Sequence, residues 1–505
     1  MTRKSILIIT PNLKGVKDGL NRIQPPLGPM IIAQVLRNKG YKVLIHDAAL
    51  EGWTRQTEID EKTVVIGQSD EEIAKVIEDS NPDVVCISAL FSNLIESAND
   101  IARLAKKVKP EVPVILGGNH ISNAITDYKY NKENPHPNVT ERLHQIENPN
   151  IDFAMYGEVD FELPKLIDYI LNGKDPKGIP GLVMQKSSDN ESYHINPAPL
   201  RINDIGELPL PARDLVNMEG YFDIGAFHSA KSKSNRVLSV MASRGCPEKC
   251  TFCTTPQMWG SIVRWRKTES IITEIKEGKE MYNIGEIQFE DDTITAHKKN
   301  LLDLCKELEK IGIPWCTPNG TKTNYHSATQ PGLYKAMADS GCYQITLACE
   351  SGVQRVLDHI IRKNLKIKQI KPAIENAKKA GMLVHTFWIL GYPGETYEEM
   401  QHTVEFAMES GADSFSFAIL SPLPGTPIYR QVMRENLWWP VRDLKDLMYR
   451  SSLIKVDGFE SPSDFEKFVT DANVKCNKIL AERDPERFKK KYGNYNDERD
   501  LVKQT

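Results

Sequence analysis

Three of the nine cysteines of this chain lie within eight residues, in the segment RGCPEKCTFC. They are Cys246, Cys250 and Cys253, separated by three and then two other residues. Four thiolates would saturate an iron–sulfur cluster or a structural zinc ion, whereas three thiolates on a four-iron cluster leave one iron open to a small molecule. The alternative is a zinc site completed by a distant His or Cys. Such sites usually use two separated cysteine pairs, and this chain has no second pair.

Composition limits the possible partners and the location of the protein. Lys and Arg number 64 and Asp and Glu 68, so the net charge of −4 predicts no general attraction to nucleic acid or to acidic membranes. No apolar stretch approaches the roughly 20 residues of a membrane-spanning helix, although peripheral attachment to a membrane stays open. Unpaired cysteines without an export signal indicate the reducing cytoplasm.

The N-terminal third alternates apolar runs with helical patterns. The runs are apolar almost throughout, as in buried parallel strands, and Ser69 with Glu72 forms a capping-box pattern before one helix. This alternation predicts a doubly wound sheet over residues 1–165, which would bind ligands at the carboxyl ends of its strands. The polar residues 119–150 are expected to form a surface loop with some helix. The predicted strands are Ser5–Thr10, Lys42–Asp47, Asp83–Leu90, Pro113–Gly118 and Asp152–Gly157.

A second strand–helix array follows a break. Residues 166–230 are rich in proline and polar runs, which predicts a hairpin and a linker. Six strand–helix units over residues 231–430 predict a partial (β/α)6 barrel, and residues 431–505 a mostly helical extension. The cysteine segment follows the first of these strands, where barrels carry their chemistry. The strands are Val237–Ser243, Glu286–Asp292, Ile313–Asn319, Tyr343–Glu350, Leu383–Leu390 and Asp413–Leu420.

This cysteine spacing after the first strand of a six-unit barrel resembles the radical S-adenosylmethionine (radical SAM) superfamily. The resemblance implies a [4Fe-4S] cluster on Cys246, Cys250 and Cys253. Its open iron would chelate the amino and carboxylate groups of SAM, and reductive cleavage would release a 5′-deoxyadenosyl radical. An external electron donor of the flavodoxin or ferredoxin type is implied as well.

Other barrel segments resemble SAM-binding positions of that family. Phe252 would approach the adenine, and Glu350 and Ser351 of the segment CESG would contact SAM. Gly391 opens the segment GYPGET, which resembles the turn beside the nucleoside. The Gly-Gly-Glu motif of many relatives is absent, so Glu290 or Asp291 would take its place at the SAM amino group. Asp291 can equally be read as a solvated strand end or a helix cap.

The N-terminal sheet before such a barrel resembles the subgroup with a cobalamin-binding, Rossmann-like domain. The segments PDVVCISAL, VILGGNH and YGEVDFELPKLI occur in the expected order. Glycine at a strand end permits close approach of a bulky group. The resemblance implies that the nucleotide tail of cobalamin would lie against Ser88, Gly117, Gly118, Gly157 and Glu158.

The loop after the first strand departs from cobalamin proteins that ligate cobalt through histidine. These carry Asp-x-His-x-x-Gly there, whereas this chain reads TPNLKGVKDGL and has no histidine before His46. We therefore expect no protein imidazole below cobalt. His46 and His120 lie at predicted strand ends, where capping of a strand is the simpler interpretation.

Together the two halves predict a cobalamin-dependent radical SAM methyltransferase of the EC 2.1.1 type. A methyl group would pass from SAM through methylcobalamin to an unactivated carbon after hydrogen abstraction; a phosphorus acceptor is the less favoured variant. The substrate, whether a small molecule or a peptide or protein side chain, is not defined by the sequence. A cyclase or oxidative rearrangement enzyme with the same cofactors is the alternative. A cobalamin- or redox-responsive binding module would have no use for an open-iron cluster.

Overall fold

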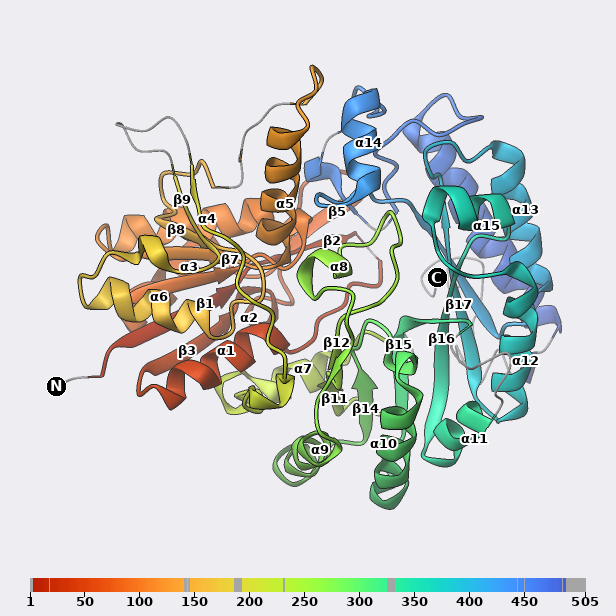
Figure 1. Cartoon of the computed structure of the whole chain (residues 1–505), viewed down its shortest axis with the longest axis horizontal. Coiled ribbons are helices and arrows are strands. Elements are labelled where there is room, and N and C mark those ends of the chain that lie inside the picture. Colours follow the sequence, from red (N-terminus) through yellow and green to blue (C-terminus); the bar gives the residue numbers. More distant parts are fainter. Residues whose placement is uncertain are drawn as a thin grey trace. The chain divides into compact units, whose positions relative to one another are not determined.

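The computed structural model describes residues 3–486, apart from residues 18, 140–142, 144–145, 186–192, 230–231, 325–331, 443, 449 and 484. The chain forms two compact units (Figure 1). The first consists of residues 1–224 with the short segments 257–259 and 423–435, and the second consists of residues 225–256, 260–422 and 436–505. A late helix, α14 (Pro427–Glu435), thus packs with the N-terminal residues, which the sequence did not indicate. The domain borders expected near residues 165, 230 and 430 stay predictions.

The first unit is built on a seven-stranded sheet in the order β10-β9-β8-β7-β6-β1-β3. Five neighbouring strands are parallel, and they coincide with the five runs predicted from the sequence. A hairpin of two further strands extends one edge. The strands are β1 (Ser5–Thr10), β3 (Lys42–Asp47), β6 (Val84–Ser88), β7 (Val114–Gly117), β8 (Phe153–Met155), β9 (Leu182–Met184) and β10 (His194–Ile195).

Helices cover both faces of this sheet, as a doubly wound fold requires (Figure 1). The first turn of α3 carries the predicted capping box of Ser69 and Glu72. One apolar core joins the sheet to α3, α4 and α5, and a second joins it to α1 and α6. The helices are α1 (Leu27–Asn38), α2 (Ala48–Glu51), α3 (Asp70–Ser80), α4 (Ile95–Val108), α5 (Asn119–Glu133), α6 (Glu162–Leu171) and α7 (Met218–Ile224).

Two features of this unit differ from the sequence-based expectation. The start of the polar segment 119–150 is a continuous helix, α5, because Ile121 and Ile125 recur at helical spacing and are fully buried. A small antiparallel sheet was also missed. It consists of β2 (Leu13–Val16), β5 (Thr63–Ile66) and β4 (Gln56–Glu58).

The second unit contains the predicted open barrel. Six parallel strands follow one another in chain order, so their carboxyl ends lie at one edge of the sheet. The strands are β11 (Val237–Val240), β14 (Glu286–Phe289), β15 (Trp315–Lys322), β16 (Cys342–Glu350), β17 (Leu383–Leu390) and β18 (Ser414–Ile419). The helices are α9 (Thr268–Tyr282), α10 (Lys298–Ile311), α11 (Gly332–Asp339), α12 (Ile370–Lys379), α13 (Tyr397–Glu409) and α15 (Pro462–Arg483).

Within the part of the chain that the structure describes, no helix is both long enough and apolar enough to cross a membrane.

Candidate active site

The three cysteines lie on a loop that follows β11. Two short strands, β12 (Ser243–Arg244) and β13 (Arg264–Trp265), pair antiparallel at the base of this loop. Gly245 starts the loop with a φ of +106°, and a Cβ at this position would lie 2.3 Å from the carbonyl oxygen of Ile262. Only glycine fits that turn without a shift of the backbone. The Cys246 amide then donates a hydrogen bond to the carbonyl of Gly260 over 3.2 Å.

Two aspartates after β14 anchor the cysteine loop. Asp291 accepts one hydrogen bond from the Ala242 amide at 3.0 Å and another from the Ser243 hydroxyl. Asp292 accepts from the Thr255 hydroxyl at 2.8 Å, at the start of α8 (Thr255–Met258). Burial raises the pKa of Asp291 to about 7 in spite of these bonds. Both of its oxygens already have donors, so loop anchoring accounts for the side chain, and its contact with SAM stays a prediction.

Glu290, the other acidic residue considered for the SAM amino group, has an oxygen to spare. Its Oε2 lies 2.8 Å from Nδ1 of His228. Its Oε1 is buried and has no hydrogen-bond partner among the described residues. An unsatisfied buried carboxylate oxygen is costly, so it indicates a missing donor. Glu290 therefore fits an amino-group ligand better than Asp291 does.

The three cysteine thiols are candidate ligands of an iron–sulfur cluster. Among the described residues, no three His, Cys, Asp or Glu side chains converge closely enough to hold one ion. Burial raises the pKa of Cys246 to about 11 and that of Cys250 to about 12. Metal binding must therefore displace protons from these thiols. Three thiols on one loop suit a four-iron cluster that keeps one iron open.

A buried ion pair lies beside the cysteine loop. Glu350 ends β16 after a bulge and has a φ of +68°, which is a strained conformation for a residue with a side chain. Its Oε1 lies 3.0 Å from Nζ of Lys363, and both side chains are almost completely buried. Burial alone would lower the pKa of Lys363, but the charges of Glu350 and then Cys250 raise it above its ordinary value. Lys363 therefore stays cationic near the cysteines.

A π-helix connects Lys363 to the cysteine loop. This element, η6 (Val356–Ile361), ends directly before Arg362 and Lys363. The Thr251 amide donates to the carbonyl of Ile361 at 2.9 Å, and the Thr251 hydroxyl donates to the carbonyl of Ile360 at 2.7 Å. π-helices are rare and often mark functional sites. Lys363 was not predicted from the sequence, because no residue pattern indicates a π-helix.

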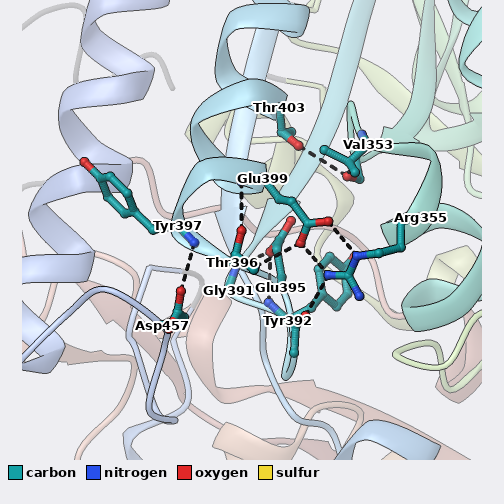
Figure 2. A network of polar contacts seen from close by, with 12 residues as sticks. Val353, Arg355, Gly391, Tyr392, Glu395, Thr396, Tyr397, Glu399, Thr403 and Asp457 are labelled. Carbon is teal, nitrogen blue, oxygen red and sulfur yellow. Dashed lines mark hydrogen bonds and ion pairs between the residues drawn. The ribbon is translucent and has the colours of Figure 1, made fainter.

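The turn after β17 is fixed by a polar network (Figure 2). Glu395 accepts hydrogen bonds from the amides of Gly391 at 2.9 Å and Tyr392 at 3.1 Å. Burial raises the pKa of Glu395 to about 8. Arg355 binds the carboxylate of Glu399 and donates to the carbonyl of Gly394 at 2.8 Å. These bonds hold the turn that the sequence assigns to the nucleoside.

Two residues predicted to bind SAM differ in what they contact. The Phe252 ring centroid lies 6.0 Å from that of Tyr392, so the cysteine loop and the turn after β17 meet there. Ser351 is fully buried, and its hydroxyl contacts Thr403 at 3.2 Å and accepts from the amide of Val353 at 3.1 Å. These bonds fix the Ser351 side chain, and contacts of Phe252, Glu350, Ser351 and Gly391 with SAM stay predictions.

In the first unit, the ends of β6 and β7 bring together Ser88 and Gly117, which are partners in register. A Cβ on Gly117 would meet only the carbonyl oxygen of Met155, at 3.9 Å, so the surface above this glycine is open. Leu90 and Phe91 after β6 are 48% and 58% exposed. An open glycine beside exposed apolar side chains suits a bulky, partly apolar cofactor at the edge where doubly wound sheets bind ligands.

The other three residues predicted to contact cobalamin have structural partners. Gly118 has a φ of +113°, and a Cβ there would lie 2.3 Å from the carbonyl oxygen of Ala89. The Gly157 amide donates to the Ser122 hydroxyl at 2.9 Å. The buried Glu158 accepts from the Ile202 amide at 3.1 Å. Gly117 is thus the residue of this group with open space, and cofactor contacts of all five stay predictions.

The two histidines considered as ligands of cobalt both bind neighbours. His46 Nε2 lies 2.6 Å from Oε1 of Gln68. His120 is almost completely buried, and its Nδ1 lies 2.8 Å from the Ser92 hydroxyl. Burial lowers the pKa of His120 to about 4, so its ring is neutral. These contacts agree with the simpler interpretation of both as polar residues near strand ends.

Sequence models of two known protein families match the chain, one in each unit. The sequence model of the radical SAM superfamily matches residues 240–407, and that of the B12 binding domain matches residues 14–132. The chain is 32% identical to the cytidylyl-2-hydroxyethylphosphonate methyltransferase of Streptomyces wedmorensis, over 94% of this chain and 90% of that protein. It is 30% identical to an uncharacterized methyltransferase of Pyrococcus horikoshii, over 86% and 84% of the two chains.

A solved structure has the same overall fold. The cobalamin-dependent S-adenosylmethionine radical enzyme OxsB, solved with aqua-cobalamin and S-adenosylmethionine bound, matches with a TM-score of 0.69 at 14% identity. The match covers 96% of this chain and 71% of that chain. The predicted succession of a Rossmann-like sheet and a partial barrel is therefore confirmed.

Proposed function

Because the chain belongs to the family of cobalamin-dependent radical SAM methyltransferases, we propose that it methylates an unactivated carbon atom of its substrate. The cofactors of the family are a [4Fe-4S] cluster, SAM and cobalamin. The observation that carries the proposal is the loop of three cysteines at the end of the first strand of an open barrel. Three thiolates leave the open iron that SAM needs.

Different residues of the barrel bind the cluster and the different groups of SAM. When bound, the cluster and SAM supply a 5′-deoxyadenosyl radical, and cobalamin carries the methyl group. Cys246, Cys250 and Cys253 hold the cluster. Lys363, cationic and buried, is suited to the SAM carboxylate, while the free oxygen of Glu290 is suited to its amino group. Phe252 and the turn at Gly391 position the adenine.

The N-terminal sheet holds cobalamin. The open surface above Gly117 supports this assignment, with Ser88 beside it and the exposed Leu90 and Phe91 next to the same strand end. Gly118, Gly157 and Glu158 shape the backbone around that edge.

The proposed reaction requires an electron donor. Reductive cleavage of SAM requires one electron, which a flavodoxin or ferredoxin supplies.

All nine cysteines are unpaired thiols, which supports a cytoplasmic location. For assays, the compound in the name of the Streptomyces relative, cytidylyl-2-hydroxyethylphosphonate, is the first trial substrate.

Anaerobic reconstitution tests the cluster. The parent protein should take up about four irons and four sulfides per chain and cleave SAM to 5′-deoxyadenosine under reduction. Cys250→Ala should lose cleavage, because two thiolates do not hold the cluster for catalysis. Cys305→Ala, which removes a buried thiol on α10, is the matched control and should keep iron and activity. Full iron content and cleavage in Cys250→Ala would refute the assignment.

A further inference from the structure

Part of the inner wall of the barrel, on β17, is exposed. Along β17 the side chains alternate, and Trp388 points outward, where its ring lies 6.0 Å from that of Phe406 on α13. His385, Phe387 and Ile389 point the other way, into the barrel, and are only half-buried. The interior of a closed (β/α)8 barrel is filled with side chains. Here the inner face of β17 keeps surface that a ligand can contact.

Small residues let strand β15 pack closely on part of this wall. Ala348 on β16 is the register partner of Phe387. A Cβ on Gly320 of β15 would lie 2.7 Å from the Cβ of Ala348 and 3.3 Å from the Phe387 ring. Ala418 on β18, the partner of Ile389, is also half-buried. The wall toward the carboxyl ends of the strands is therefore apolar, and Phe387, Ile389 and Ala418 on it keep exposed surface.

A hydrogen-bonded histidine lies at the base of this wall, nearer the amino ends of the strands. Nδ1 of His385 lies 2.7 Å from the hydroxyl of Ser414, its register partner on β18. Nε2 lies 3.1 Å from the hydroxyl of Ser416. The ring also packs edge-to-face on Phe387, with centroids 5.0 Å apart. Position and orientation of the imidazole are thus fixed on three sides.

This arrangement can both donate and accept a hydrogen bond. A neutral imidazole donates from one nitrogen and accepts at the other. Ser414 is fully buried, whereas Ser416 is 7% exposed, so Ser416 is the serine that can face a ligand. If Ser416 accepts the ring N–H, it keeps its own O–H for the ligand, and if it donates to the ring, it keeps lone pairs only. The tautomer of His385 therefore determines whether Ser416 offers a donor or an acceptor to the ligand. A ligand hydroxyl, which is itself donor and acceptor, matches either tautomer.

The sheet position also favours a neutral ligand group over an ion. In register, His385 pairs with Thr346 on one side and Ser414 on the other, so this rung of the inner face consists of neutral side chains. The carboxylate of Glu350 is engaged by Lys363, and Glu290, with one free oxygen, follows β14, which does not neighbour β17 in the sheet. Among the described register partners of His385 there is neither a carboxylate for a cation nor a cationic side chain for an anion.

We propose that Ser416, held in place by His385, binds a hydroxyl group of the methyl acceptor, and that Phe387, Ile389 and Ala418 contact its carbon chain. This inference rests on the proposed function and adds a chemical class: the substrate is an alcohol. The hydroxyl enters first, toward the amino ends of the strands. Its carbon chain then lies along the apolar wall toward the cysteine loop, at the carboxyl ends.

Equilibrium binding to the reconstituted holoprotein tests the inference with three probes. These are cytidylyl-2-hydroxyethylphosphonate, its ethylphosphonate analogue without the hydroxyl, and its phosphonoacetate analogue with a carboxylate. The parent should bind the hydroxyl probe about tenfold or more tightly than either analogue, because an unmatched buried polar group costs about 1–3 kcal/mol. In Ser416→Ala and His385→Phe this preference should fall to about twofold or less. His402→Gln, an exposed histidine on α13, should keep it.

Three results would overturn the inference. In the first, the parent does not bind the hydroxyl probe. In the second, the parent binds the carboxylate probe more tightly than the hydroxyl probe. In the third, the preference for the hydroxyl probe is the same in both variants as in the parent. Formation of 5′-deoxyadenosine is followed in the same samples. If the parent cleaves SAM and the preference is absent, only the inference fails. If the preference is present without SAM cleavage, the proposed function fails and the hydroxyl site stands.

Discussion

Lys363 is a buried cation whose charge acts on Cys250. It forms a nearly fully buried ion pair with Glu350, and the charge of Cys250 also raises its pKa. Lys363→Met should weaken SAM binding and slow 5′-deoxyadenosine formation by about tenfold or more, because a charge-assisted bond to the SAM carboxylate is lost. Lys363→Arg should restore part of both. Lys366→Met, which removes an exposed partner of Asp358, is the control. Equal SAM affinity in Lys363→Met and the parent would contradict the role.

Two adjacent glycines should respond differently to substitution. Gly117→Ala adds a Cβ in open space, so the protein should fold, whereas Gly118→Ala forces a Cβ to within 2.3 Å of the Ala89 carbonyl and should destabilise the first unit. Gly117→Trp should fold but bind no cobalamin, because the indole fills the space at the strand end. Circular dichroism and the absorbance of retained cobalamin after gel filtration measure both effects. Full cobalamin retention in Gly117→Trp would place the cofactor elsewhere.

At the scale of elements, α5 and α14 are joined by a buried ion pair within the first unit. Asp127 of α5 accepts from Arg430 at 2.9 Å and from the Gly425 amide, and the Arg430 guanidinium lies over the Tyr130 ring. Burial raises the pKa of Asp127 to about 6 from 3.8. For a raised carboxyl pKa, stability is highest below the unfolded value and falls as the pH rises through the folded value.

Arg430→Met should therefore destabilise the apoprotein in a pH-dependent way. Without the guanidinium, the pKa of Asp127 rises further, so the loss of stability continues to higher pH. The variant should lose about 3 kcal/mol at pH 8 and clearly less at pH 5, where Asp127 is protonated in both proteins. Urea unfolding at the two pH values measures this difference. An equal loss at both would show that packing of Arg430 on Tyr130, and not the charge of Asp127, is what the variant removes.

The same elements show how far the sequence predicts the fold. Buried parallel strands such as β1 and β6 are evident because their sequences are apolar almost throughout. α5 was read as an insertion because its two buried isoleucines lie among polar residues whose partners come from distant segments such as Arg430. Similarly, the short edge strands of β2, β4 and β5 carry little periodicity.

The candidate site was predictable to the extent that it is encoded in local spacing. The cysteine loop was found from three thiols, and Gly117 from a strand end. Lys363 was not, because its position depends on a π-helix, nor was His385, because its serine partners lie on the next strand. Asp291 was one of two acidic residues, with Glu290, expected at the SAM amino group; both of its oxygens bind the cysteine loop, and its contact with SAM stays a prediction. Local spacing does not show such tertiary partners.

At the scale of the whole molecule, two cofactor-binding units must act in sequence on one substrate. We expect the barrel alone to suffice for cleavage of SAM to 5′-deoxyadenosine, whereas methyl transfer should also require the cobalamin unit and yield S-adenosylhomocysteine. A cyclase with the same cofactors would form 5′-deoxyadenosine without S-adenosylhomocysteine. The ratio of these two products therefore separates the proposed reaction from its alternative.

The most direct measurement quantifies both products from reduced holoenzyme supplied with SAM and cytidylyl-2-hydroxyethylphosphonate. The parent should form 5′-deoxyadenosine and S-adenosylhomocysteine in roughly equal amounts, with a substrate mass gain of one methylene unit, because each turnover uses one radical and one methyl group. Gly117→Trp, shown to be folded, should lose chiefly S-adenosylhomocysteine and keep some uncoupled 5′-deoxyadenosine. If the parent forms 5′-deoxyadenosine and a modified product but no S-adenosylhomocysteine, the enzyme is not a methyltransferase.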